Sequence, residues 1–128
     1  MASLQSRFRD NLLTITANDP TDVPERRARF GEEAMELVQA CGGTAAEMHQ
    51  LVDYVFSRPQ GTIGAEIGGA LSTLADLANM TGHDMMLCGE VELARRETPE
   101  LIAKIRGKRS RRHGRGPLPG VEADLVPA

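Results

Sequence analysis

The chain has 128 residues, the size of a single domain, and its 41% hydrophobic and 26% charged residues are close to the globular average. This composition excludes a disordered, collagenous or membrane-spanning chain, because no apolar run approaches the roughly 18–20 residues that a bilayer requires. The first ten residues lack the apolar segment of a signal peptide, so we expect no membrane association.

The net charge of −3 conceals a strong division along the chain. Residues 1–103 carry 8 Lys/Arg and 16 Asp/Glu, whereas residues 104–115 carry 7 Lys/Arg and no acid. The sequence therefore predicts an acidic body followed by a basic segment.

Helix signals dominate the first half of the chain, and no segment alternates between apolar and polar residues for long, so we expect an all-α fold. Residues 1–21 contain a segment that can be helical. A helix is expected from Asp22, a suitable N-cap with Glu25 three residues later, to Cys41, where two glycines follow. A capping box of Thr44 and Glu47 begins the next helix, and the short connection predicts that the two helices are antiparallel partners.

Two further helices are expected in the second half. The third helix fits residues 65–81 and ends at Gly82; it contains Gly68 and Gly69, which helices retain where another backbone or a ligand comes close. The fourth begins near Asp84 and continues toward Arg106, with a kink or restart at Pro99. We therefore predict one domain over residues 1–106 and a flexible, basic tail with glycine and proline over residues 107–128.

The two cysteines, Cys41 and Cys88, match no zinc-binding spacing. Each lies among apolar helical residues, which predicts a reduced, buried thiol. Reduced thiols are typical of the cytoplasm, so we expect a cytoplasmic protein.

Three carboxylates on the helix expected between Asp22 and Cys41 are candidates for a metal site, namely Glu32, Glu33 and Glu36. Glu33 and Glu36 lie about 60° apart and one turn along, so they are neighbours, and Glu33 lies at the edge of the apolar stripe. Two like charges held together at the border of a core repel each other and are costly to desolvate. Mg²⁺ relieves both penalties. The alternative is that the three glutamates form a solvated helix face.

Glu66, in the first turn of the third expected helix, supports the metal hypothesis. If the helices pack as neighbours, Glu66 can face Glu33 and Glu36, because helical bundles build metal sites from carboxylates on facing helices.

These residues resemble a known family. The EExxE helix, the later helix that opens with Glu66 and the break at Gly82-His83-Asp84 are similar to the MazG-like nucleotide pyrophosphohydrolases of the all-α NTP pyrophosphatase superfamily. The similarity covers roughly residues 24–108. It implies an antiparallel bundle of four to five helices and hydrolysis of a nucleoside triphosphate to a monophosphate and pyrophosphate, a house-cleaning activity in the cell. It also implies a homodimer or larger homo-oligomer and a Mg²⁺ cofactor, or Mn²⁺ in its place.

The resemblance also implies roles for individual residues. Glu33, Glu36 and Glu66 correspond to metal ligands, and Glu33 or Glu32 would orient or deprotonate the attacking water. The chain departs from the family at Gly69, where the ExxD motif has its aspartate. The missing ligand could be replaced by a water or by one of four other acids, namely Glu32, Asp76, Glu90 or Glu92.

The triphosphate would also require cations. Lys104, Arg106 and Lys108 are the nearest cluster after the fourth helix, together with Arg109. Two other functions stay open for the chain. It could be a catalytically degenerate nucleotide-binding or oligomeric interaction protein, or it could associate with nucleic acid through its basic tail, which could equally be a solvated segment.

Overall fold

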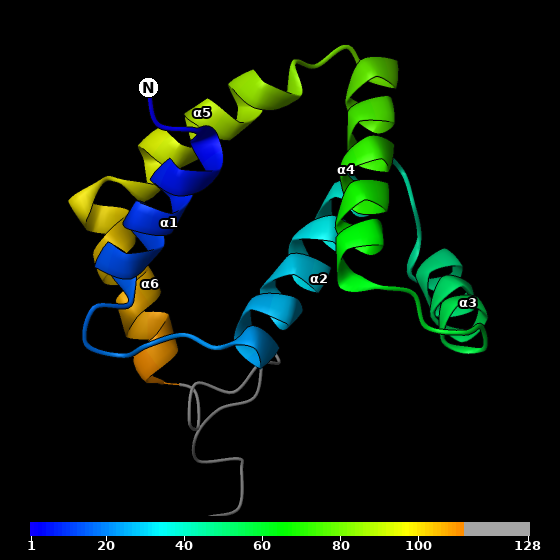
Figure 1. Ribbon diagram of the computed structural model, residues 1–128, viewed down its shortest axis with the longest axis horizontal. Coiled ribbons are helices and arrows are strands. Elements are labelled where there is room, and N and C mark those ends of the chain that lie inside the picture. The colour runs from blue at the N-terminus through cyan, green and yellow to red at the C-terminus, as the bar shows by residue number, and fades with distance from the viewer. Residues whose placement is uncertain (112–128) are drawn as a thin grey trace, which may run out of the picture. The chain divides into compact units, whose positions relative to one another are not determined.

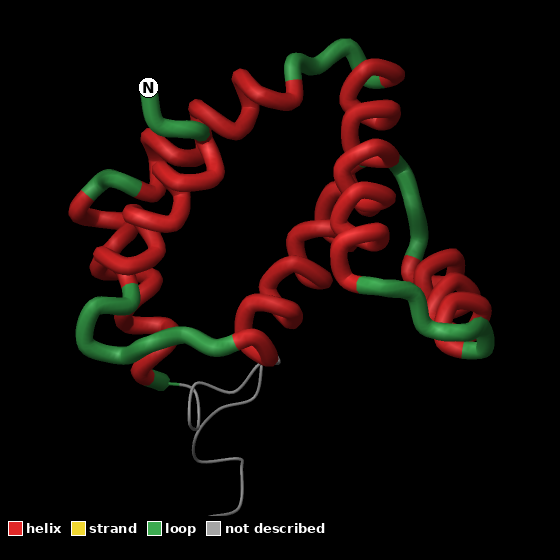
Figure 2. The backbone as a smooth tube through the Cα atoms, in the orientation of Figure 1, coloured by secondary structure: helices red, strands yellow, loops and turns green. Residues whose placement is uncertain are grey.

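The computed structural model describes residues 1–111, which contain helices and no strand (Figure 2). The all-α prediction is therefore confirmed for this part of the chain. The helices are α1 (Leu4–Ile15), α2 (Val23–Ala40), α3 (Ala45–Phe56), α4 (Ile63–Met80), α5 (Met85–Arg96) and α6 (Pro99–Ser110).

Apart from the end of α6, the predicted helix ends are confirmed to within about two residues, because capping groups expected from the sequence form. At the start of α3, the Thr44 hydroxyl accepts a hydrogen bond from the Glu47 backbone at 3.2 Å, and the Glu47 carboxylate accepts one from the Thr44 backbone. Gly42 and Gly82 follow α2 and α4 with φ of 92° and 74°, the left-handed conformation that glycine adopts without strain. The expected fourth helix restarts at Pro99, after the Thr98 cap.

The last helix extends past residue 106, where the sequence predicts that the domain ends. Gly107–Ser110 continue α6, and Arg109 within this stretch is buried. The sequence placed Arg109 in a solvated basic segment, but a buried partner holds it, as described below. Residues 112–128, the remainder of the predicted tail, lie outside the described residues.

The described chain divides into two compact units. Among the described residues, the first unit contains residues 1–29 and 86–111, and the second contains Phe30–Met85. The boundary falls within α2, so the start of this helix belongs to the first unit and its remainder to the second.

In the first unit, α1 packs along α6 (Figure 1). Leu93 is completely buried and Ile15 nearly so, and together they form the apolar core of this unit. At Gly89, a Cβ atom would lie 2.9 Å from Leu4 Cδ2, so the absence of a side chain lets α1 approach α5 closely.

Polar contacts also join α1 to α5 and α6. The Arg7 guanidinium binds both oxygens of Glu90 at 2.7 and 2.8 Å. Arg106 donates from Nε to the Ile15 carbonyl at 3.2 Å and from Nη2 to the Thr14 carbonyl. Because the last carbonyls of a helix have no partner within it, Arg106 caps the C-terminal end of α1.

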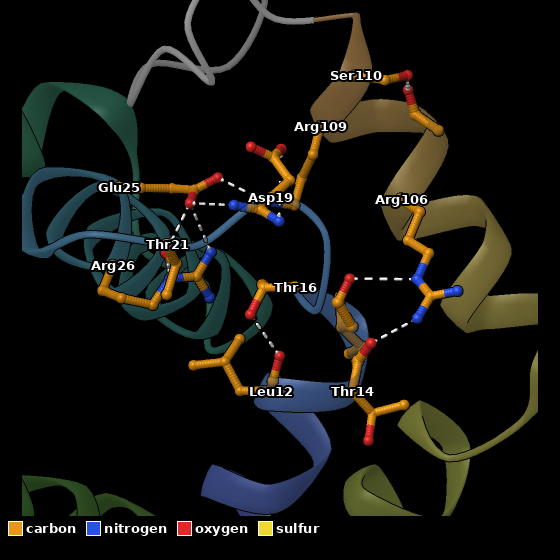
Figure 3. Close-up of polar contacts among 12 residues, drawn as sticks. Leu12, Thr14, Thr16, Asp19, Thr21, Glu25, Arg26, Arg106, Arg109 and Ser110 are labelled. Atoms are coloured by element: carbon orange, nitrogen blue, oxygen red, sulfur yellow. Dashed lines mark hydrogen bonds and ion pairs between the residues drawn. The ribbon is translucent and has the colours of Figure 1, made fainter.

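A buried ion pair connects the start of α2 to the end of α6 (Figure 3). Arg109 donates from Nε and Nη2 to the two oxygens of Glu25 at 3.0 and 2.9 Å. Glu25 is 1% exposed and Arg109 is 5% exposed. The Thr21 hydroxyl donates to Glu25 Oε1 at 2.6 Å, and Asp19 lies 3.6 Å from Arg109 Nη1. The pair is therefore well satisfied by hydrogen bonds, as a buried charge requires.

The same contacts set the pKa of Glu25. Burial raises this pKa, but the hydrogen bonds from Arg109 and Thr21 and the charges of Arg109 and Arg26 outweigh it, so the pKa falls from 4.5 to about 2. The carboxylate is thus ionised in the folded protein at any physiological pH.

The second unit contains the remainder of α2 together with α3 and α4 and has no buried residue. Its large apolar side chains are instead exposed, including Phe56 at 84% and Ile63 at 80%. The predicted antiparallel packing of α2 against α3 is not observed. In the described chain, α1 and α6 are the pair of helices with extended contact. A short connection brings two helix ends together but does not by itself bring their apolar faces into contact.

Two other sequence expectations concern the surface of the molecule. Cys41 and Cys88 are free thiols, but both are exposed, so the prediction that they are buried is wrong. None of the helices within residues 1–111 combines the length and the apolar character needed to cross a bilayer.

Replacement of Arg109 by alanine leaves the Glu25 carboxylate buried without its main partner. We expect a loss of roughly 3–5 kcal/mol in the free energy of unfolding, measured by urea denaturation. Lys108→Ala, one residue away on the exposed side of α6, is the matched control and should change the stability by less than about 0.5 kcal/mol. Equal effects of the two variants would contradict a structural role for the buried pair.

The lowered pKa of Glu25 predicts how the free energy of unfolding changes with pH. Because the folded-state pKa lies below the unfolded value, this stabilisation is fully present above about pH 4.5 and is lost as the pH falls toward 2. It amounts to roughly 3 kcal/mol. Urea titrations between pH 5 and 2 should therefore show a steeper loss for the wild type than for Glu25→Gln. Glu100→Gln, an exposed carboxylate on α6, should retain the wild-type slope.

Candidate functional site

The candidate metal ligands of α2 all lie in the second unit. Glu33 and Glu36 are exposed, and Glu32 is partly buried. The helix is regular through all three positions, so Glu33 and Glu36 occupy adjacent turns on one side of it, as predicted. Their neighbour on the same side, Leu37, is exposed as well. The carboxylates therefore stand at the border of an apolar helix face that nothing in the described chain covers completely.

Glu66 has the equivalent position on α4. It lies in the first turn, roughly 60° around the helix from Ile63, which begins an apolar stripe. Ile67 and Leu71 continue this stripe and are 64% and 55% exposed. The Glu66 carboxylate contacts the Gly61 backbone in the preceding loop, where a Cβ atom would collide with it. Glu66 is thus an exposed carboxylate beside an exposed apolar face.

The single chain does not bring these carboxylates into one cluster. Within residues 1–111, no three His, Cys, Asp or Glu side chains lie close enough together to hold a metal ion. The chemical character of Glu33, Glu36 and Glu66 suits Mg²⁺, which prefers carboxylate oxygens. Their arrangement in one chain does not suit Mg²⁺, because they do not form one cluster and the apolar faces beside them stay exposed.

The acids proposed to replace the missing aspartate differ in their surroundings. Glu90 accepts both hydrogen bonds from Arg7, and Glu92 accepts two from Arg95 at 2.7 and 2.9 Å. Each of these arginine hydrogen bonds lowers the pKa of its carboxylate. Both glutamates are therefore already occupied in ion pairs of the first unit, whereas Asp76 is exposed on α4.

The helix glycines Gly68 and Gly69 have no close neighbours. A Cβ atom at either position would meet nothing within 4 Å, so the close approach predicted for them does not occur within the chain. Gly69 leaves open space at the point where the family has its aspartate.

The basic residues predicted to bind phosphate do not act as one cluster. Lys104 and Lys108 are exposed on α6, whereas Arg106 caps α1 and Arg109 is paired with Glu25. No local pattern distinguishes these four residues, because the partners of Arg106 and Arg109 are distant in the chain.

A set of polar contacts that the sequence did not predict surrounds the start of α2. Arg26 donates from Nε to the Thr21 hydroxyl at 2.8 Å, and its Nη2 lies 3.6 Å from Glu25 Oε1. Arg96, at the end of α5, donates from Nε to Asn11 Oδ1 at 2.9 Å, and Asn11 donates in turn to the Arg96 carbonyl at 2.8 Å. In the sequence, the only indication of these contacts is the number of arginines near residue 26, and that number does not identify their partners.

Comparison with known proteins identifies no relative. No protein-family model matches the chain, no curated protein is significantly similar to it, and no solved structure matches it. The resemblance to the MazG-like family therefore depends on the carboxylate motifs and the helix pattern alone.

Proposed function

We propose that the protein is a Mg²⁺-dependent nucleoside triphosphate pyrophosphohydrolase that acts as a homodimer or larger homo-oligomer. The observation that carries the proposal is the common position of its candidate ligands. Glu33 on α2 and Glu66 on α4 both lie beside apolar helix faces that the described chain leaves exposed. If these faces pack together, the carboxylates come to the border of one core, where a hard cation is favoured.

We propose that a second copy of the chain packs against the exposed apolar faces of α2 and α4. The second unit exposes 13 large apolar side chains and buries none, although α3 begins with a complete capping box. Monomeric proteins rarely expose an apolar patch of more than about 300–600 Å². A stable dimer buries roughly 800 Å² on each partner, often with an apolar centre, which a set of side chains of this size can supply. The result would be the antiparallel bundle of four to five helices that the sequence resemblance implies.

The proposed chemistry follows from the charges of the reactants. When bound, Mg²⁺ would supply positive charge that offsets the negative charge of the triphosphate and of the pyrophosphate product. Glu33, Glu36 and Glu66 would hold it, with water in the place that the family gives to aspartate at Gly69. Glu33 or Glu32 would accept a proton from the attacking water, giving a nucleoside monophosphate and pyrophosphate.

Pyrophosphate release from a panel of nucleoside triphosphates with Mg²⁺ tests this proposal. Wild-type protein should turn over at least one of them, and Glu33→Gln and Glu66→Gln should each reduce the rate by at least about 100-fold, because each removes a charged oxygen ligand or base. Asp53→Asn is the matched control on α3, and it should retain activity.

Absence of turnover by the wild type, or equal activity in Asp53→Asn and Glu33→Gln, would contradict the enzymatic proposal. Nucleotide binding without turnover would favour the catalytically degenerate alternative. Removal of EDTA-chelatable metal should abolish the activity, and added Mg²⁺ or Mn²⁺ should restore it.

The assembly is tested separately by analytical ultracentrifugation. Wild-type protein should sediment as a dimer or larger species, and Val55→Asp or Leu71→Asp should shift it toward monomer, because a charge on a buried apolar face is costly to desolvate. Asp76→Lys lies roughly 140° around α4 from Leu71 and should leave the assembly unchanged. A monomeric wild type at micromolar concentration would contradict the proposed cover by a second copy.

A further inference from the structure

The turn between α2 and α3 is held by its own hydrogen bonds. Residues 41–44 each donate the backbone N–H to a group in the turn or in an adjoining helix, as Gly43 does to the Val38 carbonyl at 2.9 Å. Gly42 has a φ of 92°, and the Thr44 cap of α3 follows directly after Gly43. Because rotation within this turn would break these bonds, local contacts set the direction in which α3 leaves α2.

The loop between α3 and α4 is held at both of its ends. The Arg58 guanidinium lies over the Tyr54 ring, 4.9 Å from its centre, and donates to the Tyr54 hydroxyl at 3.1 Å. At the other end, the Glu66 carboxylate lies against the Gly61 backbone. Two residues separate these contacts, and one of them is a proline, whose φ is fixed. The directions of α2, α3 and α4 are therefore determined within their connections.

The apolar faces of α2 and α4 stay exposed in this arrangement. Phe30 and Leu37 share one face of α2, and Ile63 and Ile67 share one face of α4. All four are exposed within the described chain. Because local contacts hold the connections between these helices, the faces of one chain are left for another chain to cover.

The charges of the second unit favour one pairing of these faces. Residues 30–85 contain eight Asp/Glu and a single Lys/Arg, and three of the acids are glutamates of α2. Two α2 helices packed on each other would bring both sets of glutamates together, which like-charge repulsion opposes. Two α4 helices packed on each other would leave both α2 faces exposed. Pairing α2 of each copy with α4 of the other covers all these faces and brings Glu66 beside each α2, whereas Asp76 lies roughly 160° around α4 from Leu74.

We propose that α2 of one copy packs against α4 of its partner, so that each candidate metal site combines Glu33 and Glu36 of one chain with Glu66 of the partner subunit. This inference rests on the proposed function and specifies which chains build its site. An isologous dimer repeats each contact about its two-fold axis, so the shared contact occurs twice and gives two equivalent sites. It also accounts for the separation of these carboxylates within the described chain.

Mixed dimers of two variants test whether the site is shared. Full-length Glu36→Gln and Glu66→Gln chains with different affinity tags are co-expressed, and assemblies that contain both chains are isolated through the two tags. Binding of Mn²⁺ is measured by electron paramagnetic resonance without nucleotide. Each variant alone should bind Mn²⁺ at least about tenfold more weakly than the wild type, because every site lacks one charged oxygen ligand. The mixed dimer should regain about half of the wild-type number of tight sites, because one of its sites carries both substitutions and the other carries neither.

The matched control pairs a wild-type chain with a chain that carries both substitutions, and it should give the opposite result. With shared sites, each site of this dimer lacks one ligand, so tight binding should be absent. With sites formed inside one chain, the wild-type chain would keep its own site, and about half of the tight sites would remain. Both dimers contain the same two substitutions and keep every apolar side chain, so sedimentation should show that both assemble as the wild type does.

The outcomes separate the shared site from the proposed activity. Tight Mn²⁺ binding in the control dimer but not in the mixed dimer would overturn the shared site and leave the proposed hydrolysis untouched. A wild type that binds no Mn²⁺, or that sediments as a monomer, would overturn the shared site together with the proposed function. Recovery of tight sites in the mixed dimer, with no pyrophosphate release by the wild type, would support the shared site and contradict hydrolysis alone.

Discussion

The ion pair between Glu25 and Arg109 organises the first unit of this protein. A buried carboxylate is costly unless hydrogen bonds replace its water, and here a guanidinium fork and the Thr21 hydroxyl do so. Since Glu25 begins α2 and Arg109 ends α6, the pair fixes the relative position of two segments that are 84 residues apart. Arg26 lies beside the same carboxylate and donates from Nε to the Thr21 hydroxyl, so the loop before α2 is tied into this group as well.

The two units show how differently the same kind of helix can be stabilised. In the first, α1 packs on α6, and a few buried residues combine with hydrogen bonds between α1 and the last two helices. In the second, α2, α3 and α4 are regular and α3 has a capping box, yet their apolar faces are exposed. Most helix stability in proteins comes from packing of an apolar face, since propensity and caps contribute only a few kcal/mol. The second unit lacks this contribution within the described chain.

The candidate metal ligands illustrate the limit of reasoning from spacing. Helical periodicity correctly places Glu33 and Glu36 on adjacent turns of α2, because that relation is local. Their meeting with Glu66 depends on how two helix faces pack, and the described chain does not bring the three together. The same distinction applies to the cysteines, since an apolar sequence neighbourhood predicted burial but both thiols are exposed.

The sequence by itself determined the helices and their ends. The helix caps act within one turn of the backbone, as at Thr44 with Glu47 and at the glycines at 42 and 82. A new helix begins at Pro99 as expected. These effects require no contact with a distant part of the chain. Only the tertiary structure decided the partners of the charged side chains. The sequence predicted that Glu25 belongs to a helix cap, that Arg109 belongs to the basic segment and that Arg106 binds phosphate. Their actual partners are distant in sequence, and the energy of a charge depends on burial and on its neighbours, which no local pattern encodes.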